Sequence, residues 1–374
     1  MDLVRLVLGG LGMIGWLRRH ADAFRGRGDS APTVPPMDGA LRPNTLLETA
    51  RVLLRIDAPD SLVATRDGVL FSSGAGVFRL DPQSGTVASV RRFEHAVTCV
   101  ASSDEVLAVG LEDGSIRLCR AGHDLPALVT LGGQRLVCPT ALAFRDPTTL
   151  IVCQGSARNS PNHWKHDLMQ RESSGSVWQV SITDGTSRRL AGGLAFPYGA
   201  ALGNGDVVIC ESWRHRLLRL SDGSATPVLS DLPGYPARLV AAGDGGFWLS
   251  VFAPRSQLIE FVLGETAYRE RMMRELAPEH WVAPSLSPAL SFLEPMQGGA
   301  LRSHGILKAW SPTRSYGLLV RLDARLQPIA SFHSRADGRH HGVTSCVEIG
   351  SQILVSSKGG NAILALPAAA GDTP

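Results

Sequence analysis

The chain has 374 residues, of which 44% are hydrophobic and 19% charged, so it is neither a largely disordered protein nor a long coiled coil. Its net charge of +3 is too small for a nucleic-acid-binding surface, and no stretch concentrates Lys or Arg among aromatic residues. The 40 glycines and 23 prolines, spread along the chain without a triplet period, favour many tight turns and few long helices. We therefore expect an all-β protein.

Residues 1–25 form a hydrophobic N-terminal segment. Its apolar stretch, 3–17, is shorter than the ~20 residues of a simple membrane span. The basic residues follow this stretch instead of preceding it, which argues against a cleaved export signal. Two alternatives stay open: association with a membrane through residues 3–17, with the body on the cytoplasmic side, or a short helix that packs on the body. We expect a cytoplasmic or membrane-associated protein in preference to a secreted one, and a linker over 26–48.

A repeating pattern of strands begins after the linker. Apolar or alternating runs bounded by Asp-Gly, Gly-Asn-Gly or Asp-Pro turns lead into roughly four strands each. They start near Ser61, Val97, Thr140, Tyr198, Pro236 and Val343. Because the strands of a sandwich do not group in fours, this pattern predicts a six-bladed β-propeller over residues 49–367, followed by a tail at 368–374.

The ends of the repeat predict how the ring closes. The last blade lacks its outer strand, and the apolar run 49–56 before the first blade can supply it, which would remove the exposed edges of an open sheet.

Two insertions interrupt the pattern, at 155–175 and 253–316. Loops of this length inside a compact domain are usually functional, so we expect the second, with a helix over 265–276, to cap one face of the ring.

The six cysteines form no Cys-x-x-Cys pair and no metal-ligand spacing with histidine. Four of them lie in apolar, strand-like runs, where a free cysteine behaves as a small core residue. A zinc or iron–sulfur site is therefore not expected.

Several motifs in order carry a resemblance to a known family. They are Phe-Pro-Tyr-Gly at 196–199, Glu-Ser-Trp-Arg-His-Arg at 211–216, Asp-Leu-Pro-Gly-Tyr-Pro at 231–236, Gly-Phe-Trp-Leu at 246–249 and Gly-Val-Thr-Ser at 342–345. In this order and spacing the chain resembles the strictosidine synthase-like branch of the gluconolactonase and paraoxonase superfamily, over roughly residues 49–366. The resemblance implies a six-bladed propeller with a small-molecule pocket on its axis.

The resemblance also implies a metal site, and this chain departs from its usual ligand pattern. Members that hydrolyse lactones or phosphotriesters hold calcium on the axis through an acid of the first blade and Asn or Asp residues of later blades, and the ion polarises the ester carbonyl. Asp60 matches the acid, but Tyr198 and Arg238 stand where Asn or Asp is usual. A phenol and a guanidinium do not bind calcium at neutral pH, so we predict no metal and no other cofactor.

Arg238 suggests what replaces the ion. If its side chain points to the axis beside Asp60, it can bind a carboxylate or phosphate of a ligand through two parallel hydrogen bonds. The alternative is a structural Asp60–Arg238 pair that plugs the channel. Both readings stay open at this point.

The resemblance does not extend to the chemistry of strictosidine synthase itself. That enzyme condenses an amine with an aldehyde through a glutamate in its last blade, and the matching position here is Thr344, which cannot transfer a proton near neutral pH. Glu348 lies on the same side of the strand and could replace the glutamate only if the strand entered the ring more deeply. We do not expect this condensation.

The remaining candidates are histidines. His340 and His341 precede the inner strand of the last blade, where either could act as a general base, or both could belong to a plain polar turn. The predicted catalytic residues are His340, His341 and Glu348, and the predicted substrate-binding residues are Asp60, Tyr198, Trp213, Arg238 and Thr344. The leading hypothesis is a metal-independent hydrolase of an ester or lactone. The alternative is a non-catalytic propeller that binds a small molecule or serves as a scaffold.

Overall fold

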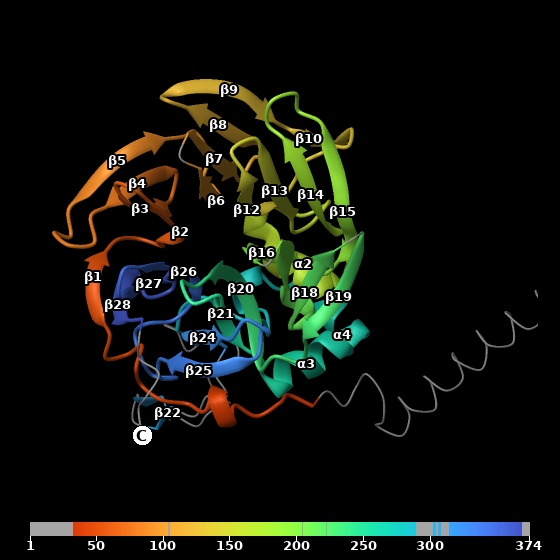
Figure 1. The fold of residues 1–374 in the computed structure, drawn as a ribbon. Helices are drawn as coiled ribbons and strands as arrows, with labels where there is room; N and C mark the ends of the chain where they lie inside the picture. The colour runs from red at the N-terminus through yellow and green to blue at the C-terminus, as the bar shows by residue number, and fades with distance from the viewer. Residues whose placement is uncertain are drawn as a thin grey trace, which may run out of the picture.

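The computed structural model describes residues 33–288 and 314–368, apart from Asp104, Asn204 and Asp222, and between these ranges the short strands β22 (Arg302–Ser303) and β23 (Ile306–Leu307). The described residues form six four-stranded antiparallel sheets arranged as blades around a central axis (Figure 1). The predicted all-β, six-bladed propeller is therefore confirmed. The N-terminal segment 1–25 and its apolar stretch 3–17 lie outside the described residues.

Each blade begins with its inner strand and runs outward. Blade one is β2 (Asp60–Thr65), β3 (Gly68–Ser73), β4 (Gly76–Leu80) and β5 (Val87–Arg92); blade two is β6 (Val97–Ser102), β7 (Val106–Leu111), β8 (Ile116–Arg120) and β9 (His123–Leu128). Blade three is β12 (Pro139–Asp146), β13 (Thr149–Gln154), β14 (Gly175–Ser181) and β15 (Ser187–Leu194); blade four is β16 (Pro197–Gly203), β17 (Asp206–Glu211), β18 (Arg216–Ser221) and β19 (Ser224–Leu229). Blade five is β20 (Gly234–Ala241), β21 (Phe247–Pro254), β24 (Leu318–Leu322) and β25 (Pro328–His333); blade six is β26 (Val343–Ile349), β27 (Gln352–Ser357), β28 (Ala362–Pro367) and β1 (Arg51–Arg55). The inner strands begin within a few residues of the six predicted starts.

The ring closes as predicted. β1 pairs antiparallel with β28, with Arg51 opposite Ala365 and Arg55 opposite Ala362, so the first strand of the chain completes the last blade. The residues before β1 also pack on the ring: η1 (Gly39–Leu41) lies against β25, and the backbone amide of the fully buried Leu47 donates to the carbonyl of His333. Part of the expected linker is thus held against blades five and six.

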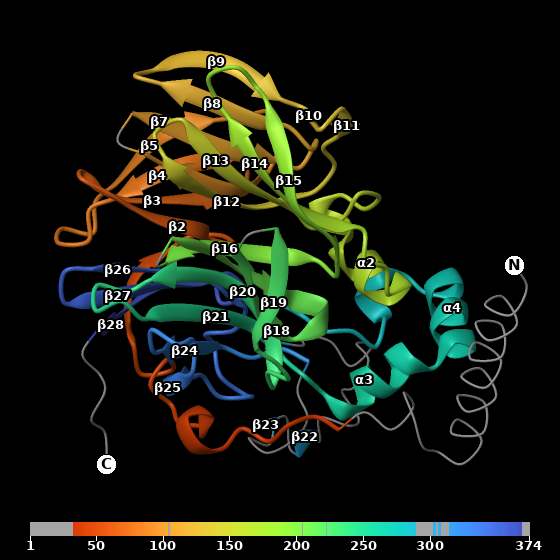
Figure 2. The ribbon, with the colours of Figure 1, turned by 45° about the vertical axis from the view of Figure 1, so that its right-hand side comes forward.

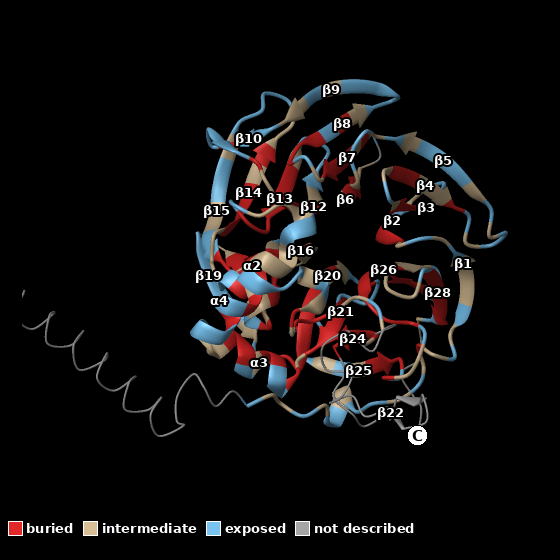
Figure 3. Ribbon diagram, turned by 180° about the vertical axis from the view of Figure 1, so that it is seen from behind, coloured by how far each residue is buried: buried red, intermediate tan, exposed pale blue. Residues whose placement is uncertain are grey.

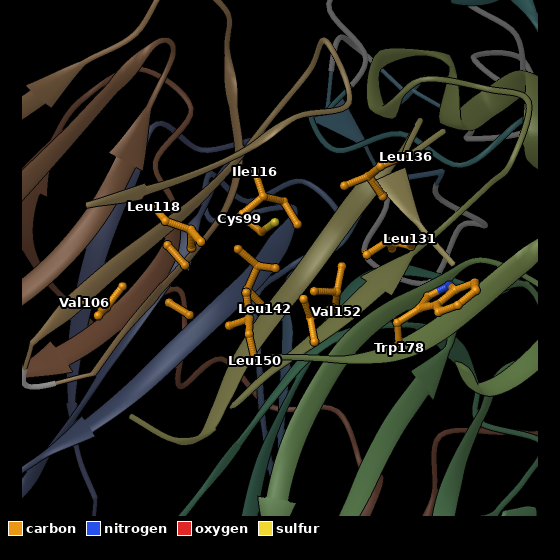
Figure 4. Close-up of a cluster of buried hydrophobic side chains, with 13 residues drawn as sticks. Cys99, Val106, Ile116, Leu118, Leu131, Leu136, Leu142, Leu150, Val152 and Trp178 are labelled. Atoms are coloured by element: carbon orange, nitrogen blue, oxygen red, sulfur yellow. The ribbon is translucent and has the colours of Figure 1, made fainter. Parts of the chain in front are cut away.

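The core lies between neighbouring blades. Figure 4 shows one such cluster, in which Cys99 and Val106 of blade two face Leu142, Val152 and Trp178 of blade three. Figure 3 shows the pattern for the whole ring: inner strands are mostly buried, while the outer strands β5, β9 and β15 are largely exposed. The inner strands are therefore fixed on both faces, and a residue at the start of one has a well-defined position on the axis.

The two insertions carry the helices. The first contains η2 (Pro161–His163) and α2 (Trp164–Gln170), and the second α3 (Gln257–Gly264), α4 (Thr266–Glu275) and η4 (Pro278–His280). Figure 2 shows α2, α3 and α4 gathered on one side of the ring. The predicted helix over 265–276 corresponds to α4, and α3 had no counterpart in the sequence prediction. Within the described ranges no helix is both long and apolar enough to cross a membrane. The remaining elements are η3 (Ser212–Arg214), β10 (Thr130–Leu131) and β11 (Gln134–Arg135).

Candidate functional site

Asp60 lies on the axis at the start of β2 and is only 3% exposed. Its Oδ1 atom accepts hydrogen bonds from Nη1 of Arg238 at 2.5 Å, from Oγ1 of Thr344 at 2.8 Å and from its neighbouring amide, that of Ser61, at 2.8 Å. Ser61 has a positive φ of 52° in a register shift of the strand, a conformation that costs about 1–2 kcal/mol for a residue other than glycine. The local backbone is therefore shaped to hold this carboxylate.

Arg238 reaches the axis from β20. Its Nη2 atom donates to the carbonyl of Thr98 at 2.7 Å and to that of Thr140 at 3.0 Å, and its guanidinium lies 5.1 Å from the centre of the Tyr198 ring. Together with Asp60, these contacts link blade five to blades one, two, three and four. Arg238 and Asp60 thus lie together on the axis, which both sequence-based interpretations require.

Lys358 is the second cation on Asp60, and sequence reasoning missed it. It directly follows β27, and its Nζ lies 3.0 Å from Oδ2 of Asp60. Because Ser357 pairs with Val343 in the antiparallel sheet, the end of β27 returns to the same level as the start of the inner strand β26. A signal was present, since only three of the 37 basic residues are lysines, and this one ends a strand at the level of Thr344.

The three charged groups hold one another ionised. Burial alone would raise the pKa of Asp60, but Arg238 and Lys358 outweigh it and lower this pKa to about 2. Burial would lower the pKa values of Lys358 and Arg238, yet the Asp60 carboxylate more than offsets this, and both pKa values are raised. Burial also raises the pKa of the Tyr198 phenol. At neutral pH the cluster therefore carries one negative and two positive charges.

A cavity of about 280 Å³ opens above this cluster. Five aromatic residues line it: Trp164, Phe196, Tyr198, Trp213 and Phe252. Among the described residues of its wall, Asp60 is the only acid and Lys358 the only base. The volume lies just below the ~300–1,000 Å³ typical of small-molecule sites.

Helix α2 forms part of the cavity wall and is tied to the ring through a buried carboxylate. Oδ1 of Asp167, which is 1% exposed, accepts the indole N–H of Trp213 at 2.8 Å, and Oδ2 accepts from Nδ2 of Asn159 at 3.2 Å. Trp213 in turn stacks on Phe196, with ring centres 4.4 Å apart. The polar 155–175 insertion thus positions two of the five aromatic rings, those of Trp164 and Trp213.

A second cavity lies on the other side of the charged cluster. It measures about 390 Å³ and is lined by the middle parts of the inner strands, mostly Ala, Val and Leu, together with Arg238 and Glu348. Asp60 lines the first cavity and Arg238 the second. The Asp60–Arg238 pair therefore separates two cavities on one axis.

The three predicted catalytic residues lie away from the aromatic cavity. His341 is fully buried, with Nδ1 2.7 Å from Oγ of Ser315 and Nε2 2.7 Å from the carbonyl of Arg335. His340 is 4% exposed, and burial lowers the pKa of both imidazoles. Glu348 lies at the second cavity, where it accepts the indole N–H of Trp248 at 2.7 Å. To act on a molecule in the aromatic cavity, these side chains would have to leave their present positions.

The predicted substrate-binding residues are brought together. Asp60, Tyr198 and Trp213 line the aromatic cavity, and Arg238 and Thr344 contact Asp60 directly beneath it. Sequence reasoning missed Lys358, Trp164, Phe252 and Asp167.

The donor set on the axis does not fit the calcium ion of the implied family. Calcium takes six to eight oxygen ligands. Here one carboxylate carries two cations within hydrogen-bond distance, and the guanidinium of Arg238 occupies the axial position beside it. Within the described residues, no group of three or more His, Cys, Asp or Glu side chains comes together in a metal-binding arrangement.

The ring of six blades and its axial cavity define a class: this is a six-bladed propeller with the gluconolactonase and regucalcin fold. It matches a gluconolactonase from Xanthomonas campestris with a TM-score of 0.54 and 14% identity, over 90% of this chain and 97% of that one. It matches regucalcin, a calcium-binding protein from Agrobacterium tumefaciens, with a TM-score of 0.50 and 13% identity, over 82% and 85% of the two chains.

The chain also resembles known proteins in sequence. The chain is 22% identical to adipocyte plasma membrane-associated protein from Rattus norvegicus over 301 residues, 72% of this chain and 80% of that protein. It is 25% identical to strictosidine synthase-like 6 from Arabidopsis thaliana over 123 residues, a third of each chain (32% and 33%). No protein-family model matches the sequence. The resemblance to strictosidine synthase-like propellers is confirmed.

Proposed function

We propose that this chain is a propeller that binds a small organic molecule in its aromatic axial cavity without a metal ion. The observation that carries the proposal is the cavity itself, with five aromatic rings above a buried cluster of one carboxylate and two cations. Aromatic walls with a few fixed polar groups are typical of sites for small organic ligands.

The metal-free part of the proposal is supported by the contacts of Asp60. Its Oδ1 already accepts three hydrogen bonds, and its Oδ2 faces the ammonium of Lys358. A divalent cation would have to displace two cations from this carboxylate. The fixed positive charges of Arg238 and Lys358 take the place of the ion.

Hydrolysis of an ester or lactone is the second candidate function. It is favoured by Lys358, whose side chain lines the cavity and could stabilise a developing oxyanion there. The candidate groups for activating water are poorly suited to that role. With a pKa of about 2, Asp60 is a weak base at neutral pH, and His340, His341 and Glu348 lie elsewhere. For this reason we place binding ahead of hydrolysis.

Calorimetric titration of the full chain with small aromatic and apolar organic molecules tests the proposal, alongside turnover of an ester and lactone panel. We expect saturable binding, little turnover, and a melting temperature that millimolar calcium or a chelator leaves unchanged. Trp213→Leu removes a cavity wall and should weaken binding, while Tyr268→Leu, on the exposed surface of α4, is the matched control. Calcium-dependent turnover, or a rise in melting temperature with calcium, would contradict the metal-free site.

A further inference from the structure

The charge cluster beneath the cavity carries a net positive charge. Asp60, Arg238 and Lys358 sum to one positive charge, and no other described residue of the cavity wall is charged. The side chain of Arg238 is 13% exposed and that of Lys358 is 28% exposed. The uncompensated charge is therefore most accessible at Lys358.

Hydrogen-bonding capacity points to the same residue. Arg238 uses Nη1 on Asp60 and Nη2 on two backbone carbonyls, and its guanidinium carbon lies over the Tyr198 ring, 5.1 Å from the ring centre. An ammonium group has three N–H donors. In the described part of the chain, the hydrogen bond to Oδ2 of Asp60 is the only one that the ammonium group of Lys358 makes, so two of its donors remain for a ligand.

The cavity walls limit what such a ligand can be. Phe196 and Phe252 are almost fully buried, at 3% and 2% exposure, and the rings of Trp164 and Trp213 lie beside them. The volume of about 280 Å³ suits a molecule built on one or two rings. A single surplus charge at the base of the cavity matches a monoanion, whereas a phosphate dianion would keep an unmatched charge in an apolar space.

We propose that the cavity selects a small aromatic monocarboxylate, whose carboxylate accepts hydrogen bonds from Nζ of Lys358 while its ring packs among the aromatic walls. This inference rests on the proposed small-molecule site and names its ligand class. It assigns the anion-binding role to Lys358, whereas one of the two sequence-based interpretations gave that role to Arg238. Arg238 holds the Asp60 carboxylate in place, and Asp60 orients the ammonium.

Ligands matched in shape test this selectivity. Phenylacetate, its neutral amide phenylacetamide and the dianion phenyl phosphate would be titrated calorimetrically into the full chain. We expect phenylacetate to bind about ten- to a hundredfold more tightly than phenylacetamide, as for other hydrogen bonds to charged groups. Phenyl phosphate should bind more weakly than phenylacetate.

Three variants locate the effect. Lys358→Met keeps the aliphatic chain and should abolish the preference for the carboxylate, while Lys358→Arg should retain most of it. Arg188→Met is the control and should leave this preference unchanged, because Arg188 is an exposed cation on the outer strand β15 and does not line the cavity.

Each outcome has a defined meaning. Equal binding of phenylacetate and phenylacetamide to the unmodified chain, or tighter binding of phenyl phosphate, overturns the ligand class but leaves the small-molecule site standing. Absence of binding by all three probes overturns both proposals. The comparison in the unmodified chain decides the matter even if Lys358→Met does not fold.

Discussion

Oδ1 of Asp60 and Nη1 of Arg238 lie 2.5 Å apart on the propeller axis, although 178 residues separate the two in the chain. The pair joins the first blade to the fifth, and through the carbonyls of Thr98 and Thr140 it also holds blades two and three. This ion pair thus joins blades at the centre of the ring, and the pairing of β1 with β28 joins the two ends of the chain at its outer side.

Arg238→Met should destabilise the fold strongly. The substitution leaves two backbone carbonyls without their donor and removes one of the two cations on a buried carboxylate. Breaking a buried pair in this way typically costs about 3–5 kcal/mol. Chemical denaturation at neutral pH measures the loss, and Arg271→Met, whose ion pair with Glu275 on α4 is exposed, gives a comparison outside the axis. A loss below about 1 kcal/mol, the range of exposed ion pairs, would mean that the axial pair is not structural.

Acid should weaken the fold through His333. Burial lowers the pKa of this imidazole from 6.5 to about 4, with Nε2 2.8 Å from Oγ of Ser331. Between these two values the unfolded chain binds a proton that the folded chain does not, so stability is present above pH 6.5 and falls as the pH drops towards 4. The expected contribution between pH 7 and pH 5 is about 2 kcal/mol.

Denaturation curves at several pH values measure this dependence, and His333→Phe should reduce its slope over that range. The buried His340 and His341, whose pKa values are also lowered, keep the rest of it. A slope unchanged in the variant would show that His333 is protonated in the folded protein or accessible to water.

Much of the fold could be predicted because it follows local rules. Turn signals and alternating apolar patterns predicted the blades, and an unpaired apolar run before the first blade predicted the closure by β1. Helix α3 was not predicted because its apolar residues do not form one stripe. Ile259 and Val262 are buried. Leu258 and Phe261, on the other side of the helix, are about half exposed. A helix that is apolar on several sides has no clear period of 3.6 residues.

The site was predictable only where it follows the inner strands. Asp60 and Tyr198 lie at or next to the start of such strands and Arg238 lies in the middle of one, so their positions in the motifs placed them on the axis. Lys358 lies after a second strand, and its approach to Asp60 depends on the pairing of β26 with β27, which the motifs do not encode. Part of the aromatic wall was missed for a similar reason, since Trp164 enters from an insertion outside the repeat.

Leu47→Ala tests how far the residues before β1 contribute to the ring. This side chain is fully buried in the cluster that also contains Trp248 and Phe332, and its truncation should cost about 2–5 kcal/mol. Arg51→Ala, an exposed position in β1, is the matched control and should change stability by less than about 0.5 kcal/mol. Thermal and chemical unfolding of both variants decide the point, and equal effects would mean that this stretch is not an integral part of the ring.

Asp167 should control the shape of the cavity without contacting the ligand. Asp167→Ala leaves the indole N–H of Trp213 and the amide of Asn159 without their acceptor, which should cost about 1–3 kcal/mol and loosen α2 against the cavity. Ligand affinity, measured by calorimetry, should fall with it. Asp167→Asn keeps an oxygen for Trp213 but loses the acceptor for Asn159, so it should retain more of the stability and affinity at neutral pH than Asp167→Ala does.

The pH dependence of the same two variants separates a positioning role from a general packing defect. Burial raises the pKa of Asp167 above its usual value of 3.8, so its stabilising contribution is present below that value and is lost as the pH rises through the folded-state pKa. Asn does not ionise, so Asp167→Asn should lose this component of the pH profile while the Trp213 contact persists. If Asp167→Asn instead weakens ligand binding as much as Asp167→Ala does, the hydrogen bond to Trp213 is not what shapes the cavity.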